Sequence, residues 1–190
     1  MALPPHSETE RGLALQEIVE ACHDGEYFHW PNPTKADYEV FGEIIWLFTG
    51  IDFVLRMAAE AMDDNGMLQP PFKGKVRELS IKRTTDAIMS SPVWNDSHRY
   101  AFNRINEHRK LRNLIGHFIG KRFIEDDAFI FMTKCADDYE QVYGTRPAPN
   151  QMLYGIVDAQ QVRNARPETK DLLEWAQKLP KDLSTPVRRP

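Results

Sequence analysis

The residues best suited to chemistry lie in the stretch Arg109–Phe118, where the pair Arg112-Asn113 is followed by His117 within an apolar helical pattern. A guanidinium keeps its positive charge at physiological pH and can hold a phosphate. An imidazole titrates near neutrality and can take up or release a proton. Together these side chains could hold a phosphodiester and move a proton at it, without a metal ion.

The pattern around these residues predicts one long helix from Trp94–Asp96 to about Arg122. On a helical wheel its apolar face, which would pack on another helix, consists of Leu111, Ile115, Phe118 and Ile119. Arg112 and His117 fall on the two flanks of the exposed face. Between them lie Asn113 and a strip of two glycines, Gly116 and Gly120, whose bare backbone would let a phosphate or a second helix approach. A symmetric dimer would use this strip twice and bring two such pairs around one cleft.

The segment Arg112-Asn113-Leu114-Ile115-Gly116-His117 resembles the Arg-polar-x-x-x-His signature of the HEPN superfamily, which includes bacterial toxins and abortive-infection proteins. The resemblance extends over the helices expected in residues 34–122. One subgroup of this superfamily has a tyrosine two residues after the histidine. This chain has Ile119 at that position and so departs from the pattern of the subgroup.

The resemblance implies a bundle of four or five helices, a homodimer and, in many members, metal-independent cleavage of RNA. Carried over to this chain, Arg112 would contact the scissile phosphate, Asn113 would orient the phosphate or the imidazole, and His117 would be the acid and base. Other members of the superfamily serve only as scaffolds.

Several cations on the same predicted helix could extend the site into a track for RNA phosphates: Arg104, His108, Arg109, Lys110 and Lys121. An ordinary solvated helix surface explains the same residues equally well. The plain alternative for the motif itself is that Arg112 lies along the bundle, His117 is a surface histidine and Gly120 begins a helix cap.

Composition limits the other possibilities. The chain has 190 residues and a net charge of -4, so bulk electrostatic coating of nucleic acid is not expected, although a local basic patch could grip a few phosphates. Cys22 and Cys135 lie far apart and indicate reduced thiols in a cytoplasmic protein. The longest apolar segment, Tyr38–Met62, carries charges such as Glu43, Asp52, Arg56 and Glu60, so no membrane span is expected. No cofactor is expected. We also expect no metal, because the carboxylate pairs lack a third ligand at suitable spacing.

Periodicity and capping signals predict a mainly α fold with a small β-containing C-terminal appendage. A helix follows the capping box at Ser7–Glu10, a long helix begins at Thr34, and a third helix ends at Ser91-Pro92. Two short runs rich in aromatic and β-branched residues, 128–133 and 152–157, are typical of strands around a short helix at 137–143. A last helix is expected to open at Pro167. These elements suggest a bundle over residues 1–125, with its core at 34–122, and an appendage over 126–190 in the same domain.

The sequence therefore favours a homodimeric, metal-independent endoribonuclease of toxin or phage-defence type that cuts single-stranded RNA. An antitoxin or operon partner would accompany such a protein. The alternatives are a non-catalytic helical dimer that binds a nucleotide or a partner protein, and a structural protein of a defence operon.

Overall fold

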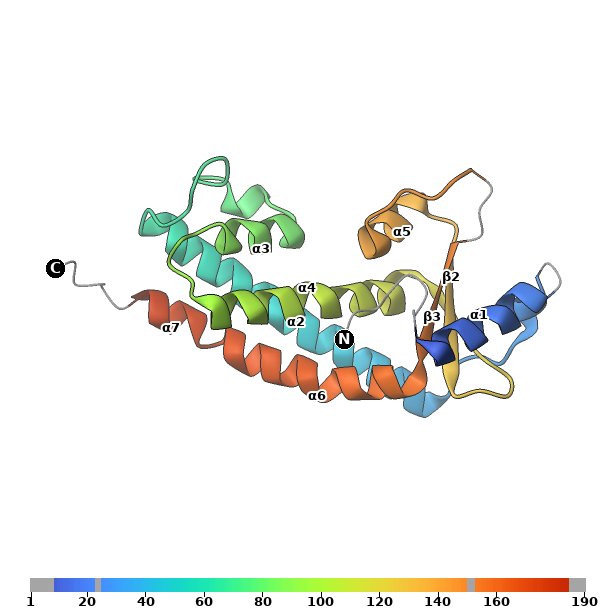
Figure 1. Ribbon diagram of the computed structural model, residues 1–190. Helices are drawn as coiled ribbons and strands as arrows, with labels where there is room; N and C mark the ends of the chain where they lie inside the picture. Colours follow the sequence, from blue (N-terminus) through green and yellow to red (C-terminus); the bar gives the residue numbers. More distant parts are fainter. Residues whose placement is uncertain (1–8, 23–24, 150–152, 185–190) are drawn as a thin grey trace. The chain divides into compact units, whose positions relative to one another are not determined.

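The computed structural model describes residues 9–22, 25–149 and 153–184 (Figure 1). Within them the fold is mainly helical with a small antiparallel sheet, as predicted from the sequence. In chain order the elements are α1 (Glu10–Ala21), η1 (Glu26–His29), α2 (Lys35–Asp64), η2 (Val76–Glu78), α3 (Ile81–Met89), α4 (Asp96–His117), β1 (Ile119–Arg122), β2 (Ala128–Thr133), α5 (Ala136–Tyr143), β3 (Leu153–Asp158), α6 (Ala159–Ala176) and α7 (Leu179–Ser184).

The helices begin where local capping chemistry allows. Before α2, the Thr34 backbone N–H donates to Asp37 Oδ2 at 2.7 Å, and the Asp37 N–H donates to Thr34 Oγ1 at 3.3 Å. This reciprocal pair satisfies two N–H groups that the helix leaves free. Thr9 caps α1 and Ser80 caps α3 in the same manner, with one bond each. Ser7, which the sequence placed in the first capping box, lies outside the described residues.

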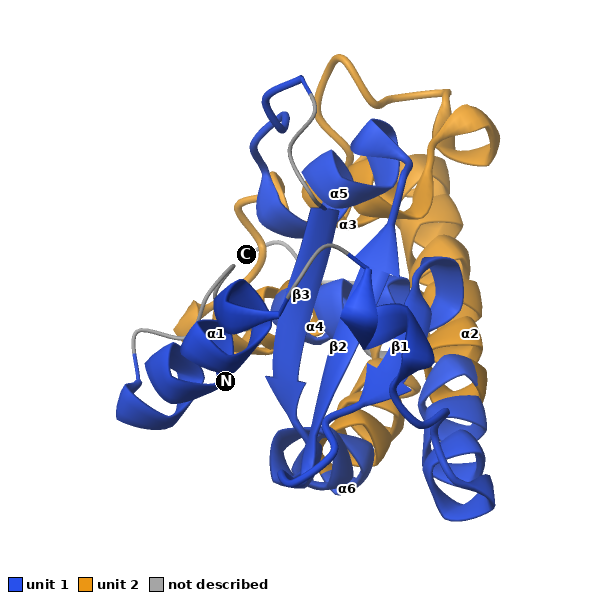
Figure 2. Ribbon diagram, turned by 90° about the vertical axis from the view of Figure 1, so that its right-hand side faces the viewer, with its two compact units in different colours: residues 1–45, 107–167 blue, residues 46–106, 168–190 orange. Residues whose placement is uncertain are grey.

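The chain divides into two compact units (Figure 2). Unit 1 comprises residues 1–45 and 107–167, and unit 2 comprises residues 46–106 and 168–190. The division falls within α2, α4 and α6.

Unit 1 is built around the sheet, whose strand order is β1-β2-β3 with both pairs antiparallel. The central strand β2 is buried on both faces, which explains its continuous apolar sequence. Its alternate residues Ala128, Ile130 and Met132 share a cluster with Leu15 and Val19 of α1, Trp30 and Phe123. The intervening Phe129 and Phe131 lie 5.2 and 5.8 Å from the Phe41 ring of α2, measured between centroids.

Unit 2 is helical and its core is aromatic at one end. Phe102 of α4 lies between Trp94 and Trp175, with ring centroids 5.5 and 5.2 Å away, and the Trp94 indole N–H donates to the Ile88 carbonyl at 2.7 Å. Gly50 lets α2 approach α6, because a Cβ there would lie only 3.2 Å from the Leu173 methyl groups. Fully buried residues of α2 complete this core: Phe48, Ile51, Leu55 and Met62.

Two expected helix boundaries are wrong. α4 ends at His117 rather than near Arg122, because residues 119–122 pair with β2 as strand β1. α6 begins at Ala159, where the Asp158 carboxylate accepts the Gln160 N–H at 2.8 Å, and Pro167 lies inside the helix. The cap at Asp158 gives the helix an earlier start than the one predicted at the proline.

Candidate functional site

The three residues of the motif lie together at the C-terminal end of α4, in unit 1. Arg112 Nη1 lies 3.4 Å from His117 Nε2 and 3.2 Å from Asn113 Oδ1. The His117 side chain is 43% exposed, whereas Arg112 is half-buried. The guanidinium and the imidazole are therefore in direct contact and not on separate flanks of the helix.

A fourth residue, Asp138, joins this group from α5. Its Oδ1 lies 3.5 Å from His117 Nδ1, and its side chain is 24% exposed. The imidazole is thus placed between a carboxylate on Nδ1 and a guanidinium on Nε2. The carboxylate favours the neutral tautomer that carries its proton on Nδ1, because only an N–H can donate to it. Nε2 then carries the lone pair, which faces the guanidinium of Arg112.

The sequence did not predict the part played by Asp138. Asp137 and Asp138 lie in the first turn of α5, where acidic side chains suit the helix dipole, and this local role gives no sign of a distant partner. No local pattern connects residue 138 with residue 117. The hairpin of β1 and β2 returns the chain to the end of α4 and brings the carboxylate to the histidine.

Tight packing holds α5 in place next to the motif. Tyr139 and Val142 are buried, and Tyr143 lies against Gly155 of β3, where an added Cβ would overlap the Tyr143 hydroxyl and come within 3.2 Å of Leu114 Cδ2. Burial raises the pKa of Tyr143 far above its ordinary value, with smaller contributions from Tyr139 and Tyr154. The phenol therefore stays neutral. The contact of Tyr143, Gly155 and Leu114 joins α5, β3 and α4, so it fixes the distance from Asp138 to His117.

The predicted track of cations is only partly at the surface. His108 and Arg109 are 4% and 8% exposed, and Arg104, in unit 2, forms an ion pair with Glu168. Lys110 is exposed. Lys121 belongs to β1 instead of the helix, and its Nζ contacts Asn32 Oδ1 at 2.8 Å. The expected row of five cations along one helix surface is therefore not formed.

The two glycines of the predicted strip also differ in their surroundings. Gly116 is exposed, and an added Cβ would meet no atom within 4 Å. Gly120 is in β1, where a Cβ would lie 3.0 Å from Phe131 Cε1. A continuous bare strip along α4 is thus absent, because Gly120 supports strand packing and not access to a ligand.

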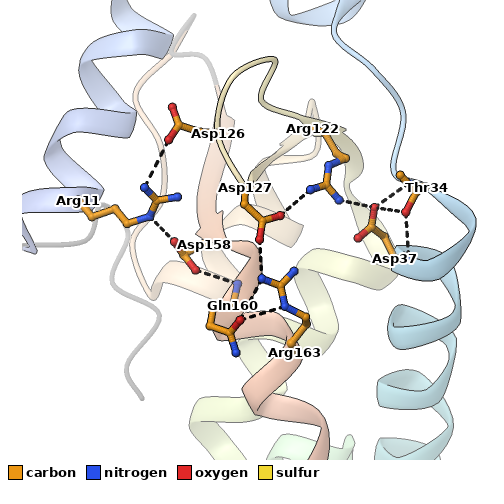
Figure 3. A network of polar contacts seen from close by, with 9 residues as sticks. All are labelled: Arg11, Thr34, Asp37, Arg122, Asp126, Asp127, Asp158, Gln160 and Arg163. Carbon is orange, nitrogen blue, oxygen red and sulfur yellow. Dashed lines mark hydrogen bonds and ion pairs between the residues drawn. The ribbon is translucent and has the colours of Figure 1, made fainter.

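A polar network that the sequence did not indicate lies elsewhere in unit 1 (Figure 3). Arg122 of β1 contacts Asp37 at 2.6 Å and Asp127 at 2.5 Å, and its guanidinium carbon lies 5.2 Å from the centre of the Phe129 ring. Asp127 also pairs with Arg163 of α6. A second branch joins Arg11 to Asp126 and Asp158. The network connects segments that are far apart in the sequence, and it holds the hairpin that follows the motif.

The charges of this network alter the titration of its carboxylates. The hydrogen bond from Arg163, together with the charges of Arg163 and Arg122, lowers the pKa of Asp127 against the opposing effect of burial. Burial acts to raise the pKa of Asp37, but hydrogen bonds from Thr34 and Arg122 outweigh it and the pKa is lowered. Both groups are therefore ionised at neutral pH.

Among the described residues, no group of three or more histidine, cysteine, aspartate or glutamate side chains is placed to hold a metal ion. No helix in the same part of the chain is long and apolar enough to cross a membrane.

Comparison of the chain with protein-family models, with curated proteins and with solved structures gave no match. The assignment of a function thus depends on the chemistry of the residues themselves.

Proposed function

We propose that this protein is a metal-independent endoribonuclease that cuts single-stranded RNA through attack of a 2′-hydroxyl on the adjacent phosphate. The observation that carries the proposal is the contact of the half-exposed His117 with Arg112 on one ring nitrogen and with Asp138 on the other. This arrangement combines a base of defined tautomer with a permanent cation, which are the two groups that the reaction needs.

In the proposed reaction, His117 Nε2 takes the proton of the 2′-hydroxyl while the 2′-oxygen forms a bond to phosphorus. The bond from phosphorus to the 5′-oxygen breaks, and the proton on Nε2 passes to that leaving oxygen. The products are a 2′,3′-cyclic phosphate and a 5′-hydroxyl end, and no water or other reactant is consumed. Arg112 stabilises the negative charge that builds on the phosphoryl oxygens.

Each supporting residue has a defined part in this proposal. Asn113 accepts a hydrogen bond from Arg112 Nη1 and limits the rotation of the guanidinium. Arg112 Nε is buried without a hydrogen-bond partner among the described residues, so the guanidinium retains donor capacity. Asp138 is a positioning residue because it acts on the substrate only through His117. The proposal includes growth arrest by RNA breakdown when the protein is expressed, as in a toxin.

The test is cleavage of a fluorogenic single-stranded RNA by the purified protein. Acid-base assistance contributes about 10²–10⁴-fold to such reactions, so His117→Ala should lower the rate by at least about a hundredfold. Arg112→Ala should cause a comparable loss. Lys170→Ala is the matched control, because it removes an exposed cation of α6 that belongs neither to the motif nor to the predicted track of cations, and it should leave the rate unchanged.

Product analysis and chelation make the test specific. Mass spectrometry should find cyclic phosphate ends, and EDTA should not lower the rate. Cleavage that survives in both alanine variants would rule out this site. RNA or nucleotide binding without cleavage, lost in Arg112→Ala, would instead favour the non-catalytic alternative.

A further inference from the structure

The segment that joins α2 to the first turn of α3 has a charge opposite to that of the whole chain (Figure 1). Residues 65–85 contain five cations and a single acid, Glu78, although the chain carries a net charge of -4. All five cations are exposed and belong to unit 2. They form a surface that we call the α3 basic patch: Lys73, Lys75, Arg77, Lys82 and Arg83.

The backbone that carries the patch is anchored to α2. The Gly74 N–H donates to both carboxylate oxygens of Asp63 at 3.0 Å, and Arg56 Nη1 donates to the Leu79 carbonyl at 3.1 Å. Val76 and Leu79 are 5% and 7% exposed, so their apolar side chains hold the turn η2 against the core of the unit. The cations alternate with these buried residues and therefore stand on a structured surface.

Most charges of the patch have no structural partner. Arg77 Nε lies 3.4 Å from Glu60 Oε1, but the Arg77 side chain is still 90% exposed. The other four cations form no ion pair with a residue that the structure describes. Because these charges do not hold the fold together, they are available to an anion from solution.

Two of the cations lie where they oppose the dipole of their own helix. Lys82 and Arg83 are in the first turn of α3, directly after the N-cap Ser80, and this turn has no acidic residue. The N-terminus of a helix carries partial positive charge, so acidic side chains stabilise it and cationic side chains destabilise it. A local rule that is broken without a structural gain is typical of a functional position.

We propose that the α3 basic patch binds the phosphate backbone of single-stranded RNA. Lysine and arginine side chains neutralise phosphates, and such contacts carry no information about the base sequence. The choice of RNA as the ligand rests on the proposed function, whereas the binding itself uses no residue of the motif. None of the five cations belongs to the predicted track of cations, so the patch is a separate surface.

The composition of the patch favours RNA over an anionic membrane. Adsorption on a lipid surface depends on buried apolar side chains as well as on charge. Within residues 65–85, all of which the structure describes, no large apolar side chain is exposed, and Phe72 is half-buried. The patch therefore presents charge without the apolar side chains that would enter a bilayer.

Fluorescence anisotropy with a labelled uridine oligonucleotide measures the binding. Every protein in the experiment carries His117→Ala, because the proposed reaction would otherwise destroy the probe. On single strands, the logarithm of the association constant falls with the logarithm of the salt concentration by about 0.7 per phosphate contact. The variant Lys73→Gln/Lys75→Gln/Lys82→Gln/Arg83→Gln should therefore reduce the steepness of this salt dependence by roughly 2–3 and weaken binding about a hundredfold at ~0.1 M salt.

Two double variants of equal net charge separate the patch from bulk electrostatics. Lys82→Gln/Arg83→Gln should reduce the steepness of the salt dependence by about 1.4. Lys170→Gln/Lys178→Gln removes two exposed cations of the same unit outside the patch and should leave the salt dependence unchanged. In urea, Lys82→Gln/Arg83→Gln should unfold at the same or a higher concentration than its parent, because it removes unfavourable charges from the start of α3.

Three results would overturn the proposal. The first is a parent protein that does not bind the oligonucleotide, including one that sediments with phosphatidylserine vesicles through these cations instead. The second is an unchanged salt dependence in the quadruple variant, whose fold circular dichroism verifies. The third is an equal loss of steepness in Lys170→Gln/Lys178→Gln, which would assign the binding to overall charge. RNA cleavage is measured separately with the wild type, so a failure of the nuclease proposal and a failure of the patch are distinguishable.

Discussion

At the residue scale, the arrangement at His117 assigns different tasks to its two ring nitrogens. Nδ1 faces a carboxylate and Nε2 faces a guanidinium. A histidine without such partners exchanges its proton between both nitrogens, and only a fraction of the molecules then has the lone pair where the substrate needs it. In the proposed reaction Asp138 selects one tautomer, because its charge attracts an N–H on Nδ1 and repels a lone pair there.

Asp138→Asn is expected to weaken this selection while preserving the shape of the side chain. The amide can donate a hydrogen bond to Nδ1 and so stabilises the opposite tautomer. Nitrogen-15 NMR of the His117 ring should detect the change in tautomer, and RNA cleavage should lose part of the about 10²–10⁴-fold that acid-base assistance provides.

Asp137→Asn serves as the matched control for this prediction. Asp137 is the neighbouring carboxylate, 73% exposed and 3.2 Å from Arg146. The Asp137→Asn substitution should leave both the nitrogen-15 signals of the His117 ring and the rate of RNA cleavage unchanged. An Asp138→Asn protein with wild-type ring signals would show that the carboxylate does not set the tautomer, even if the nuclease proposal holds.

At the element scale, the signals that predicted the fold correctly were local ones. Thr34 and Asp37 form the capping box that their spacing indicates, and β2 covers the run 128–133. The end of α4 was missed because β1 exists only through its pairing with β2, which no helical pattern reveals. Asp138 was missed for the same reason, since a long-range contact brings it to His117.

The packing of α5 against β3 and α4 gives a prediction for Gly155. Gly155→Ala places a methyl group where the Tyr143 hydroxyl lies, so the Tyr143 side chain must move, and we expect α5 to move with it because Tyr143 packs this helix on β3. Overpacking of this kind costs about 1–3 kcal/mol, which urea unfolding should detect. The same shift moves Asp138 away from His117, so RNA cleavage should fall as well.

Two further variants separate this steric effect from a general effect of alanine. Gly116→Ala meets open space in α4 and should leave the protein as stable as the wild type or up to about 1 kcal/mol more stable. Gly155→Ala/Tyr143→Phe removes the overlapping hydroxyl and should recover part of the lost stability. A Gly155→Ala protein that unfolds like the wild type would contradict the close contact.

At the scale of the whole molecule, the ionic network joins segments that the sequence separates widely. Arg122 connects the hairpin to the start of α2, and Asp127 connects it to α6 through Arg163. The residues that form these ion pairs follow no recognisable motif in the sequence. Their pairing becomes visible only in the folded chain. Their charges make the stability of the fold dependent on pH.

Acid should destabilise the protein through Asp37 and Asp127. Both have a pKa below the ordinary value in the folded chain, so their stabilising contribution is complete above the unfolded pKa of about 3.9 and is lost as the pH falls through the lower folded values. The free energy of unfolding in urea should therefore decrease from about pH 5 downward.

Asp127→Asn should be less stable than the wild type at pH 7, because Arg122 and Arg163 lose their shared partner, and its stability should fall less steeply in acid. Asp171→Asn, an exposed carboxylate of α6 outside the network, should keep the wild-type dependence on pH. Equal acid sensitivity of Asp127→Asn and the wild type would mean that Asp127 does not contribute to this dependence.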